Sequence, residues 1–291
     1  MDAKDDYLYI AGADSGLVIA DISDPSHPQI IGKIHKRAED FILIDGNYLY
    51  TDSNGNLDIW NISIPTSPSL VSSTPLGRGS LWEAKKYGDK YLVLATSKGL
   101  TIVDISDKSN VTIVSNATNV GCQDVKIKDN IAIVTEFGPG KIRMVDISNP
   151  IAPVTLFEGR SGGGGRKLVV YDNYAIVLGG TKLYIWDISN PANPQLISTQ
   201  QIFKVADSHM IPEDSEVANG YIYVAQYWGG LKIYRLQTEP DTTPPTISNV
   251  DVSVTNNSAT ITWQTNELAD SLVKYGVESG NYVYQAYDSS Y

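Results

Sequence analysis

The amino-acid sequence predicts an all-β protein: a six-unit β-propeller with four-stranded blades, its terminal units incomplete, followed by a partial β-sandwich. Three observations support this prediction. One short pattern recurs six times along the chain. The recurring strand is apolar on both faces, so it must be covered on both. The connections between strands are hairpin-short, and no stretch of helical periodicity separates them.

The recurring pattern is an apolar strand that ends in an acidic residue and usually continues as Ile-Ser. The strand-end position is filled, at intervals of 40 to 48 residues, by Asp21, Asn61, Asp104, Asp146, Asp187 and Arg235. A period in this range is typical of a four-stranded propeller blade. The Asp carboxylate is expected to accept backbone N–H groups of the turn that follows. Asn61 and Arg235 depart from the pattern, which predicts looser turns there.

The second repeat carries all four strands expected of a blade. We place them at residues 41–44, 48–51, 57–60 and 69–72. Gly46-Asn47 is a favoured two-residue hairpin turn between the first two strands. Pro65 and Pro68 cannot lie in a central strand, because proline lacks the backbone donor, so they mark the loop before the outermost strand.

The two terminal repeats are predicted to be incomplete. The first begins at its second strand, residues 7–10, without an innermost strand, and the sixth ends after its third strand. We therefore expect that a longer natural chain supplies residues before Met1. The full ring would then hold six or more blades, and strand pairing between the two terminal units would contradict this expectation.

The repeat resembles that of the LVIVD-repeat β-propellers of bacterial and archaeal surface proteins. The resemblance covers roughly residues 5–237 and rests on four strands that are each followed by Ile-Ser: Leu17–Asp21, Leu100–Asp104, Ile142–Asp146 and Leu183–Asp187. WD40 propellers are the nearest alternative, since Trp60-Asn61 and Trp186-Asp187 are similar to their strand-end dipeptide, but no Gly-His partner lies upstream. The resemblance implies a secreted or cell-surface setting.

A proline-rich segment is expected to separate two domains. We assign residues 1–238 to the propeller, 239–246 to a stiff linker and 247–291 to a second β domain. Alternating strands with Trp263 as core anchor resemble the start of a fibronectin type III domain. Because such a domain needs about 100 residues, this one would be partial, and we expect lower order from Val277 onward.

Composition and charge exclude several classes of partner. The net charge is −11, so nucleic acid is a poor partner for this surface. No apolar run of about 18 residues occurs, which predicts no transmembrane segment. The single cysteine, Cys122, can form no internal disulfide and is expected to be a buried apolar residue. Met1 is followed at once by charged residues, so a signal peptide and an anchor are expected to lie outside this sequence.

Few residues suggest a catalytic or metal-binding role. His209 lies beside Asp207 in an acidic insertion, but a stable metal site usually takes three or four converging ligands, so a solvated loop is the simpler interpretation. Short segments at 52–58 and 161–167 are similar to calcium and phosphate loops but lack the bidentate Glu and the following helix. We predict no cofactor. The residues expected to line the channel and face a ligand lead the innermost strands: Asp40, Glu83, Asp124, Arg166 and Lys167.

Two functions stay open at this point. The first is a non-catalytic extracellular or cell-surface module that binds a protein or a glycan through the propeller faces and loops. The second is a propeller enzyme, or a metal- or ligand-binding protein, with a site at the face near His209. The fold does not discriminate between them. An enzyme requires polar groups from several blades that meet in one pocket, and we favour the non-catalytic module.

Overall fold

The structure is a computed structural model that describes residues 1–12, 16–36, 41–138, 140–160, 165–202, 212–226, 230–236, 244–266, 269 and 271–288. The chain divides into two compact units, Met1–Leu236 and Gln237–Tyr291. The described residues contain strands and turns and no helix. Accordingly, none of them belongs to a helix long and apolar enough to cross a membrane.

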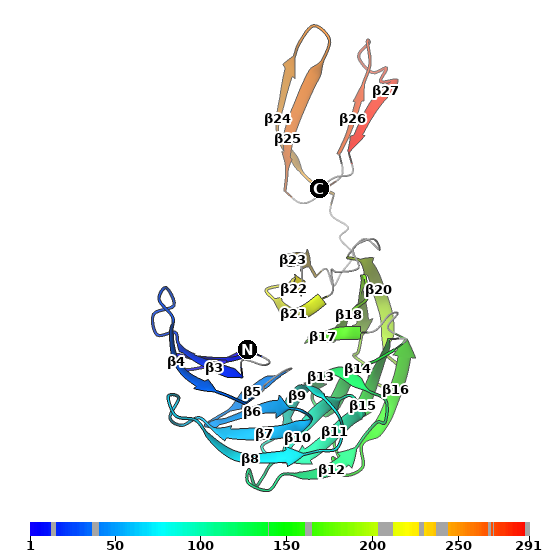
Figure 1. Ribbon diagram of the computed structural model, residues 1–291. Coiled ribbons are helices and arrows are strands. Elements are labelled where there is room, and N and C mark those ends of the chain that lie inside the picture. Colours follow the sequence, from blue (N-terminus) through cyan, green and yellow to red (C-terminus); the bar gives the residue numbers. More distant parts are fainter. Residues whose placement is uncertain are drawn as a thin grey trace. The chain divides into compact units, whose positions relative to one another are not determined.

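The first unit is a series of six antiparallel sheets, called blades 1 to 6 (Figure 1). In each blade, chain order runs from the innermost strand to the outermost. Blade 1 is β1 (Asp2–Lys4), β2 (Tyr7–Ala11), β3 (Leu17–Asp21) and β4 (Gln29–Ile34). Blade 2 is β5 (Ile42–Asp45), β6 (Tyr48–Ser53), β7 (Asn56–Asn61) and β8 (Ser69–Pro75). Blade 3 is β9 (Leu81–Tyr87), β10 (Tyr91–Thr96), β11 (Gly99–Asp104) and β12 (Thr112–Asn116).

The remaining three blades continue the same order. Blade 4 is β13 (Cys122–Lys128), β14 (Ile131–Glu136), β15 (Lys141–Asp146) and β16 (Val154–Arg160). Blade 5 is β17 (Gly165–Tyr171), β18 (Tyr174–Gly179), β19 (Lys182–Asp187) and β20 (Gln195–Gln201). Blade 6 is a three-stranded sheet of β21 (Pro212–Ala218), β22 (Tyr221–Gln226) and β23 (Gly230–Arg235). The predicted all-β, six-unit propeller is confirmed.

Blade 1 differs from the prediction in one respect. We expected no innermost strand there, but β1 pairs antiparallel with β2, with Asp2 opposite Tyr9. The strand has only three residues and a polar sequence. A bond to the next blade holds β1 in place: the backbone N–H of Ile44 in blade 2 donates to the Asp2 carboxylate at 3.0 Å. Blade 1 is therefore complete, and of the two terminal blades only blade 6 has fewer than four strands among the described residues.

The strand-end residue fixes the turn after the third strand of each of blades 1 to 5. Its side-chain oxygen accepts the N–H of the serine two positions later at 2.8–2.9 Å, and the acceptors are Asp21, Asn61, Asp104, Asp146 and Asp187. The prediction of a looser turn at Asn61 is wrong, since the amide oxygen takes the place of a carboxylate oxygen there. The turn after Arg235 lies outside the described residues.

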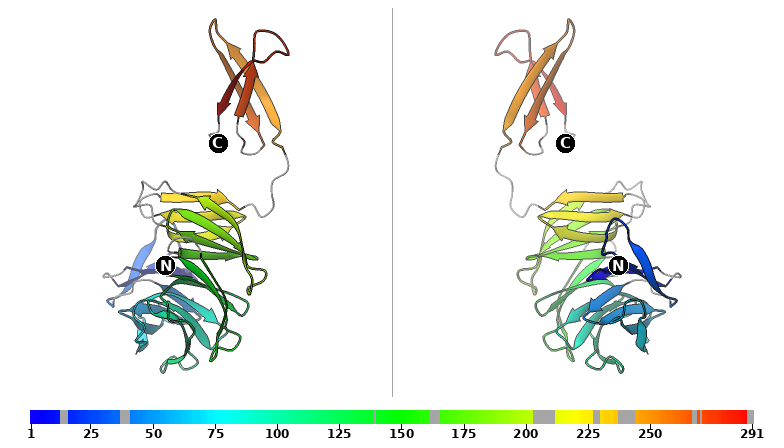
Figure 2. Two further views of the ribbon diagram at one scale, coloured as in Figure 1. Left: turned by 90° about the vertical axis from the view of Figure 1, so that its right-hand side faces the viewer. Right: turned by 90° about the vertical axis from the view of Figure 1, so that its left-hand side faces the viewer.

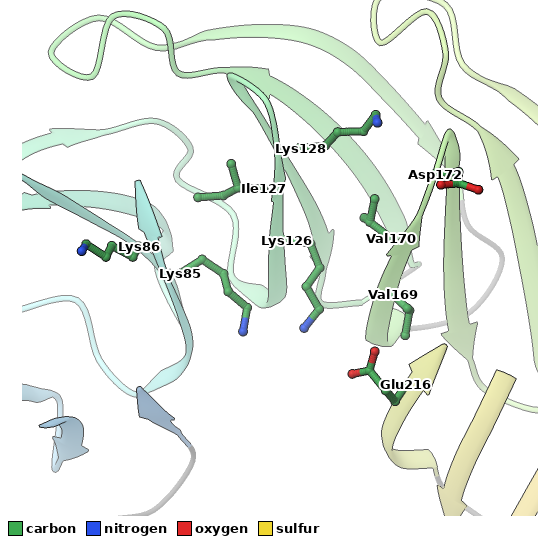
Figure 3. Close-up of a pocket in the computed structure, with 9 residues that line it drawn as sticks. All are labelled: Lys85, Lys86, Lys126, Ile127, Lys128, Val169, Val170, Asp172 and Glu216. Atoms are coloured by element: carbon green, nitrogen blue, oxygen red, sulfur yellow. The ribbon is translucent and has the colours of Figure 1, made fainter. Parts of the chain in front are cut away.

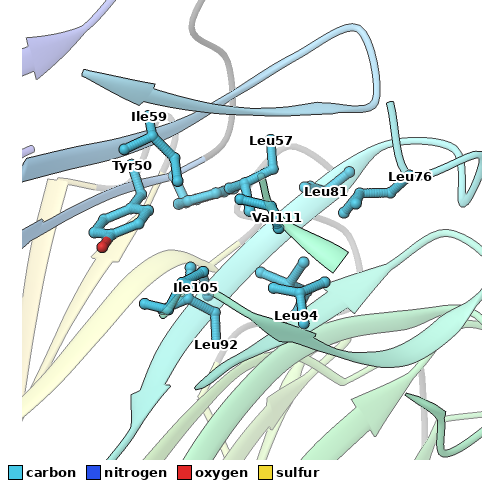
Figure 4. Packing of buried hydrophobic residues seen from close by; sticks show 12 residues of the cluster. Tyr50, Leu57, Ile59, Leu76, Leu81, Leu92, Leu94, Ile105 and Val111 are labelled. Atoms are coloured by element: carbon cyan, nitrogen blue, oxygen red, sulfur yellow. The ribbon is translucent and has the colours of Figure 1, made fainter. Parts of the chain in front are cut away.

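Neighbouring blades bury each other's apolar faces. Leu57 and Ile59 of blade 2 are fully buried in one cluster with Leu92 and Leu94 of blade 3 (Figure 4). Each fully buried side chain of this size contributes about 1.5–3 kcal/mol through the hydrophobic effect. This mutual covering explains why the repeated strand is apolar on both faces.

The blades follow one another as a series. The innermost strands contact their neighbours from β1 and β5 through β9, β13 and β17 to β21 (Figures 1 and 2). Within the described part of the chain, no sheet includes strands of both blade 6 and blade 1, and no contact of comparable extent joins them. Among the described residues, blade 6 therefore packs extensively against a neighbouring blade on one side only.

The second unit consists of two hairpins. They are formed by β24 (Ile247–Val254) with β25 (Ala259–Thr265), and by β26 (Ser271–Tyr275) with β27 (Tyr284–Asp288). Alternating strands were predicted in this domain, and Trp263 lies in one of them, β25. Trp263 is only half-buried and Val277 is 95% exposed, so these strands bury little apolar surface. The fibronectin-like identity of the unit stays a prediction.

Candidate functional site in the central channel

The candidate site is built on the innermost strands of blades 3 to 6. Each of these strands contains a β-bulge near its start, where one extra residue interrupts the register. A bulge changes the direction in which the following side chains point. After the bulge, equivalent register positions are occupied by Glu83, Asp124, Lys167 and Asp214, opposite Ala95, Thr135, Leu178 and Ala225.

Glu83 and Asp124 meet through lysine side chains. The Lys126 ammonium lies 3.3 Å from Asp124 Oδ1 and 4.0 Å from Glu83 Oε2. Lys85 lies 3.2 Å from Glu83 Oε1. The four side chains alternate in sign across blades 3 and 4, so each carboxylate has a cation beside it.

Asp124 also ties two blades together. Its side chain is only 1% exposed, and its Oδ2 accepts the backbone N–H of Leu168 in blade 5 at 2.9 Å. Asp2 makes the same type of bond to Ile44 between blades 1 and 2. The innermost strand of a blade has one edge with no strand beside it, and these carboxylates provide acceptors for its N–H groups. Asp124 is thus in part a structural residue.

Burial and neighbouring charges shift the pKa values of Asp124 and Lys126 in opposite directions. Burial raises the pKa of Asp124, and Lys126 counteracts part of that increase. Burial would lower the pKa of Lys126, but the carboxylates of Asp124 and Glu83 outweigh it and raise that pKa. The ammonium therefore stays charged at neutral pH.

A cleft of about 590 Å³ opens beside this network (Figure 3). Its lining comes from β9, β13, β17, β21 and the turn after β17. It includes four lysines, two acids and three aliphatic side chains: Lys85, Lys86, Lys126, Lys128, Asp172, Glu216, Ile127, Val169 and Val170. Lys85 and Lys126 extend into the same open space, with Glu216 across from them. Lys128 forms no ion pair within the described residues. The cleft can therefore offer a ligand both signs of charge and an apolar floor.

The structure brings together three of the residues predicted to line the channel: Glu83, Asp124 and Lys167, whose charge acts on Asp124. Arg166 is the bulge residue of β17, so Lys167 and not Arg166 is the register counterpart of Asp124. The side chain of Arg166 lies outside the described residues, as do Asp40, Asp207 and His209. The cleft lysines were not predicted from the sequence. Their signal was Lys126 and Lys128 at alternate positions, with the apolar Val125 and Ile127 before and between them.

The other candidate residues have structural roles. Cys122 is buried, and burial raises the pKa of its thiol to about 11, which makes it unreactive at neutral pH. Asp58, in the calcium-like segment, binds Lys36 at 2.6 Å. Among the described residues, no group of three or more His, Cys, Asp or Glu could hold a metal ion.

Comparison with known proteins supports the repeat and the fold. The model of the LVIVD repeat matches residues 2–35, 38–74, 87–119, 121–158 and 162–201. No curated protein sequence matches the chain.

Several solved structures are similar in fold. A putative 6-phosphogluconolactonase from Bacteroides fragilis is 12% identical, with a TM-score of 0.67 over 92% of this chain and 85% of that one. BamB from Moraxella catarrhalis is 14% identical, with a TM-score of 0.58 over 81% and 69%. A chain of the mitotic checkpoint complex is 12% identical, with a TM-score of 0.65 over 79% and 71%. At these identities the similarity concerns the fold alone.

Proposed function

This chain belongs to the LVIVD-repeat family, and on that basis we propose that it is a non-catalytic binding module. It acts outside the cytoplasm, secreted or at the cell surface, and binds a protein partner at the channel cleft. One observation carries the proposal: four lysines, two acids and three aliphatic side chains, from successive innermost strands and one adjoining turn, line one cleft of about 590 Å³. Such a surface suits a segment that carries both polar and apolar side chains.

A protein suits the cleft better than a glycan. Lys126 and Glu216 present opposite charges to the same open space. A protein segment can complement both charges with its own side chains. A neutral glycan would remove water from these groups without supplying an opposite charge, which is unfavourable.

The bonds made by the channel acids support a non-catalytic role. A general base must be free to accept a proton from a substrate. Asp124 is instead buried, bonded to Leu168 N–H and paired with Lys126. Glu83 is paired with Lys85. The acids next to the cleft thus hold the blades and the lysines in position.

The extracellular setting rests on sequence features. The family resemblance implies surface proteins, and four Asn-x-Ser/Thr sequons, at Asn61, Asn110, Asn116 and Asn256, suit a secreted chain. The chain of the mitotic checkpoint complex with this fold belongs to a protein assembly, which supports protein binding by the propeller.

Site-specific photo-crosslinking tests the proposal. A photoreactive residue replaces Lys128 in the cleft, and in a control chain it replaces Lys33, which is exposed on the outermost strand of blade 1. Both chains are added to intact cells of the source organism. We expect one protein to crosslink at position 128 and not at 33, and Lys126→Glu to reduce its yield at least about tenfold. Equal capture at both positions, or none at 128, would contradict the proposal.

The enzyme alternative has its own test. Divalent metal titrations compare the intact protein with His209→Ala. A metal affinity that the variant loses would favour a site at His209. We expect no such difference, since binding at the cleft does not require that residue.

A further inference from the structure

The last residue of the innermost strand bonds to the next blade at three successive junctions of the propeller. In each case its side chain makes a hydrogen bond of 2.7–2.8 Å with a side chain of the following blade. The pairs are Lys4 with Asn47, Asp45 with Lys86, and Tyr87 with Asn130. These bonds join blade 1 to blade 2, blade 2 to blade 3 and blade 3 to blade 4.

The junction between blades 4 and 5 has the same residue types without the bond. Lys128 ends the innermost strand of blade 4, and Asn173 precedes the second strand of blade 5. By register they are the counterparts of Lys4 and Asn47, which bond directly. Within the described part of the chain, neither the Lys128 nor the Asn173 side chain has a hydrogen bond or an ion pair. A lysine and an amide that can bond to each other are therefore both open at this junction.

Both side chains line a groove of about 180 Å³, which we call the junction groove. Its apolar lining consists of Ile131, Ile133, Met144 and Ile188. Pockets for drug-sized ligands measure about 300–1,000 Å³, so the junction groove has room for one side chain and not for a larger molecule. Lys128 also lines the channel cleft, so the groove continues the cleft toward blade 5 (Figure 3).

A carboxylate with an apolar group beside it complements this groove. The carboxylate accepts charge-assisted hydrogen bonds from the Lys128 ammonium and a further bond from the Asn173 amide N–H. The apolar group then lies against the apolar lining and loses contact with water. The C-terminal residue of a protein carries a carboxylate and a side chain on the same carbon atom. An internal Asp or Glu has the carboxylate but no apolar group of its own, so the C-terminal residue fits better.

We propose that the junction groove binds the C-terminal residue of the partner protein, and that this residue has an apolar side chain. The inference rests on the proposed function, because the segment before the C-terminus would lie in the channel cleft that Lys128 also lines. Asp129 and Asp172 lie beside the groove and the cleft. Both are exposed, and water weakens their repulsion of a bound carboxylate.

Methyl NMR on the full chain tests the proposal with a defined probe, the N-acetylated peptide Gly-Ser-Gly-Leu with a free C-terminal carboxylate. We expect the methyl signals of Ile131, Met144 and Ile188 to shift with a dissociation constant of about 1 mM. The signal of Ile59, which is buried between blades 2 and 3, should not move. The C-terminal amide of the same peptide should bind at least about tenfold more weakly, because it lacks the charge. The acid Gly-Ser-Gly-Ser should be weakened by a similar factor, because it lacks the apolar side chain.

Lys4 provides the matched control for Lys128. Lys128→Met removes the ammonium and keeps a long side chain at the groove, so this variant should bind the acid as weakly as the amide. Lys4→Met removes the same group at the junction of blades 1 and 2 and should leave the titration unchanged. Three results would overturn the proposal: no shift of the groove methyl signals, equal binding of acid and amide to the wild-type chain, or full binding of the acid by Lys128→Met.

Crosslinking at position 128 separates this inference from the proposed function. The photoreactive residue is a diazirine analogue of lysine, which keeps the ammonium. Mass spectrometry of the captured protein should place the crosslink in its C-terminal peptide. A crosslink to an internal segment would overturn the inference and leave the proposed function in place. Binding of the probe peptide without any captured protein would contradict the proposed function, and the groove would still bind an apolar C-terminal residue.

Discussion

Leu57 of blade 2 and Leu231 of blade 6 occupy the same position of the repeat, yet Leu57 is fully buried and Leu231 is 60% exposed. Both belong to an apolar third strand that pairs with the second strand in the same antiparallel register. The difference lies in the neighbour, since blade 3 covers Leu57 and no described blade covers Leu231.

This comparison shows how stability is distributed in a repeat protein. Each blade has apolar residues on both faces, but a face stabilises the fold only where a neighbour excludes water from it. Nearest-neighbour interfaces therefore supply much of the free energy of unfolding. Substitutions at equivalent positions should then have effects that depend on the blade, which can be measured directly.

The largest expected effect is at the interior leucine. Leu57→Ala should destabilise the fold by about 3–5 kcal/mol, because it removes buried methyl groups and leaves a cavity between blades. Leu231→Ala, the matched substitution in blade 6, should cost less than about 0.5 kcal/mol. Urea titration followed by circular dichroism measures both. Equal losses would mean that another surface covers blade 6 in solution.

The paired acids of the channel give a second, smaller contrast. Asp124→Ala should cost about 3 kcal/mol, because it leaves the Leu168 N–H without its acceptor and Lys126 without its nearer carboxylate. Asp214→Ala, at the equivalent but exposed position, should change the free energy of unfolding by less than about 0.5 kcal/mol. The same urea titrations apply. If the two variants were equally stable, the bond from Asp124 to blade 5 would not contribute to the fold.

The sequence predicted the repeating part of the molecule well and its exceptions less well. The regular spacing of the repeat placed the third strands correctly. Most of the apolar third strands end in an Asp that fixes the next turn, so the two features recur together. The three-residue β1 was missed, since Asp2-Ala3-Lys4 has no apolar pattern and depends on the bond from Asp2 to Ile44 in the next blade. Such a tertiary bond leaves no local signal.

The candidate site was predicted only in part, and the bulges are the reason. One extra residue in each of four innermost strands shifts the register, so the sequence pattern named Arg166 and Lys167 together and did not show that Lys167 alone is the register counterpart of Asp124. The cleft lysines were not recognised, because a lysine in a strand is usually a solvated residue. Their convergence depends on the placement of β9, β13 and β17 around one channel.

The smallest predicted effect concerns the strand-end turn. The Ser148 N–H holds the pKa of Asp146 below its usual value. Because the folded pKa is lower than the unfolded value of about 3.9, the contribution of the carboxylate is present above that pH and is lost as the pH falls through the folded pKa. Asp146→Ala should cost only about 0.5–1 kcal/mol at neutral pH, since the turn is solvated.

Asparagine provides the matched control for this turn. Asn61 accepts the Ser63 N–H at 2.9 Å in blade 2, so Asp146→Asn should keep the turn bond without its ionisation. Urea titrations at several pH values compare the two variants with the wild-type chain. Asp146→Asn should lie close to the wild type at neutral pH, and the deficit of Asp146→Ala should shrink below about pH 4. A deficit that is independent of pH would show that the Asp146 carboxylate stabilises the turn through its shape alone.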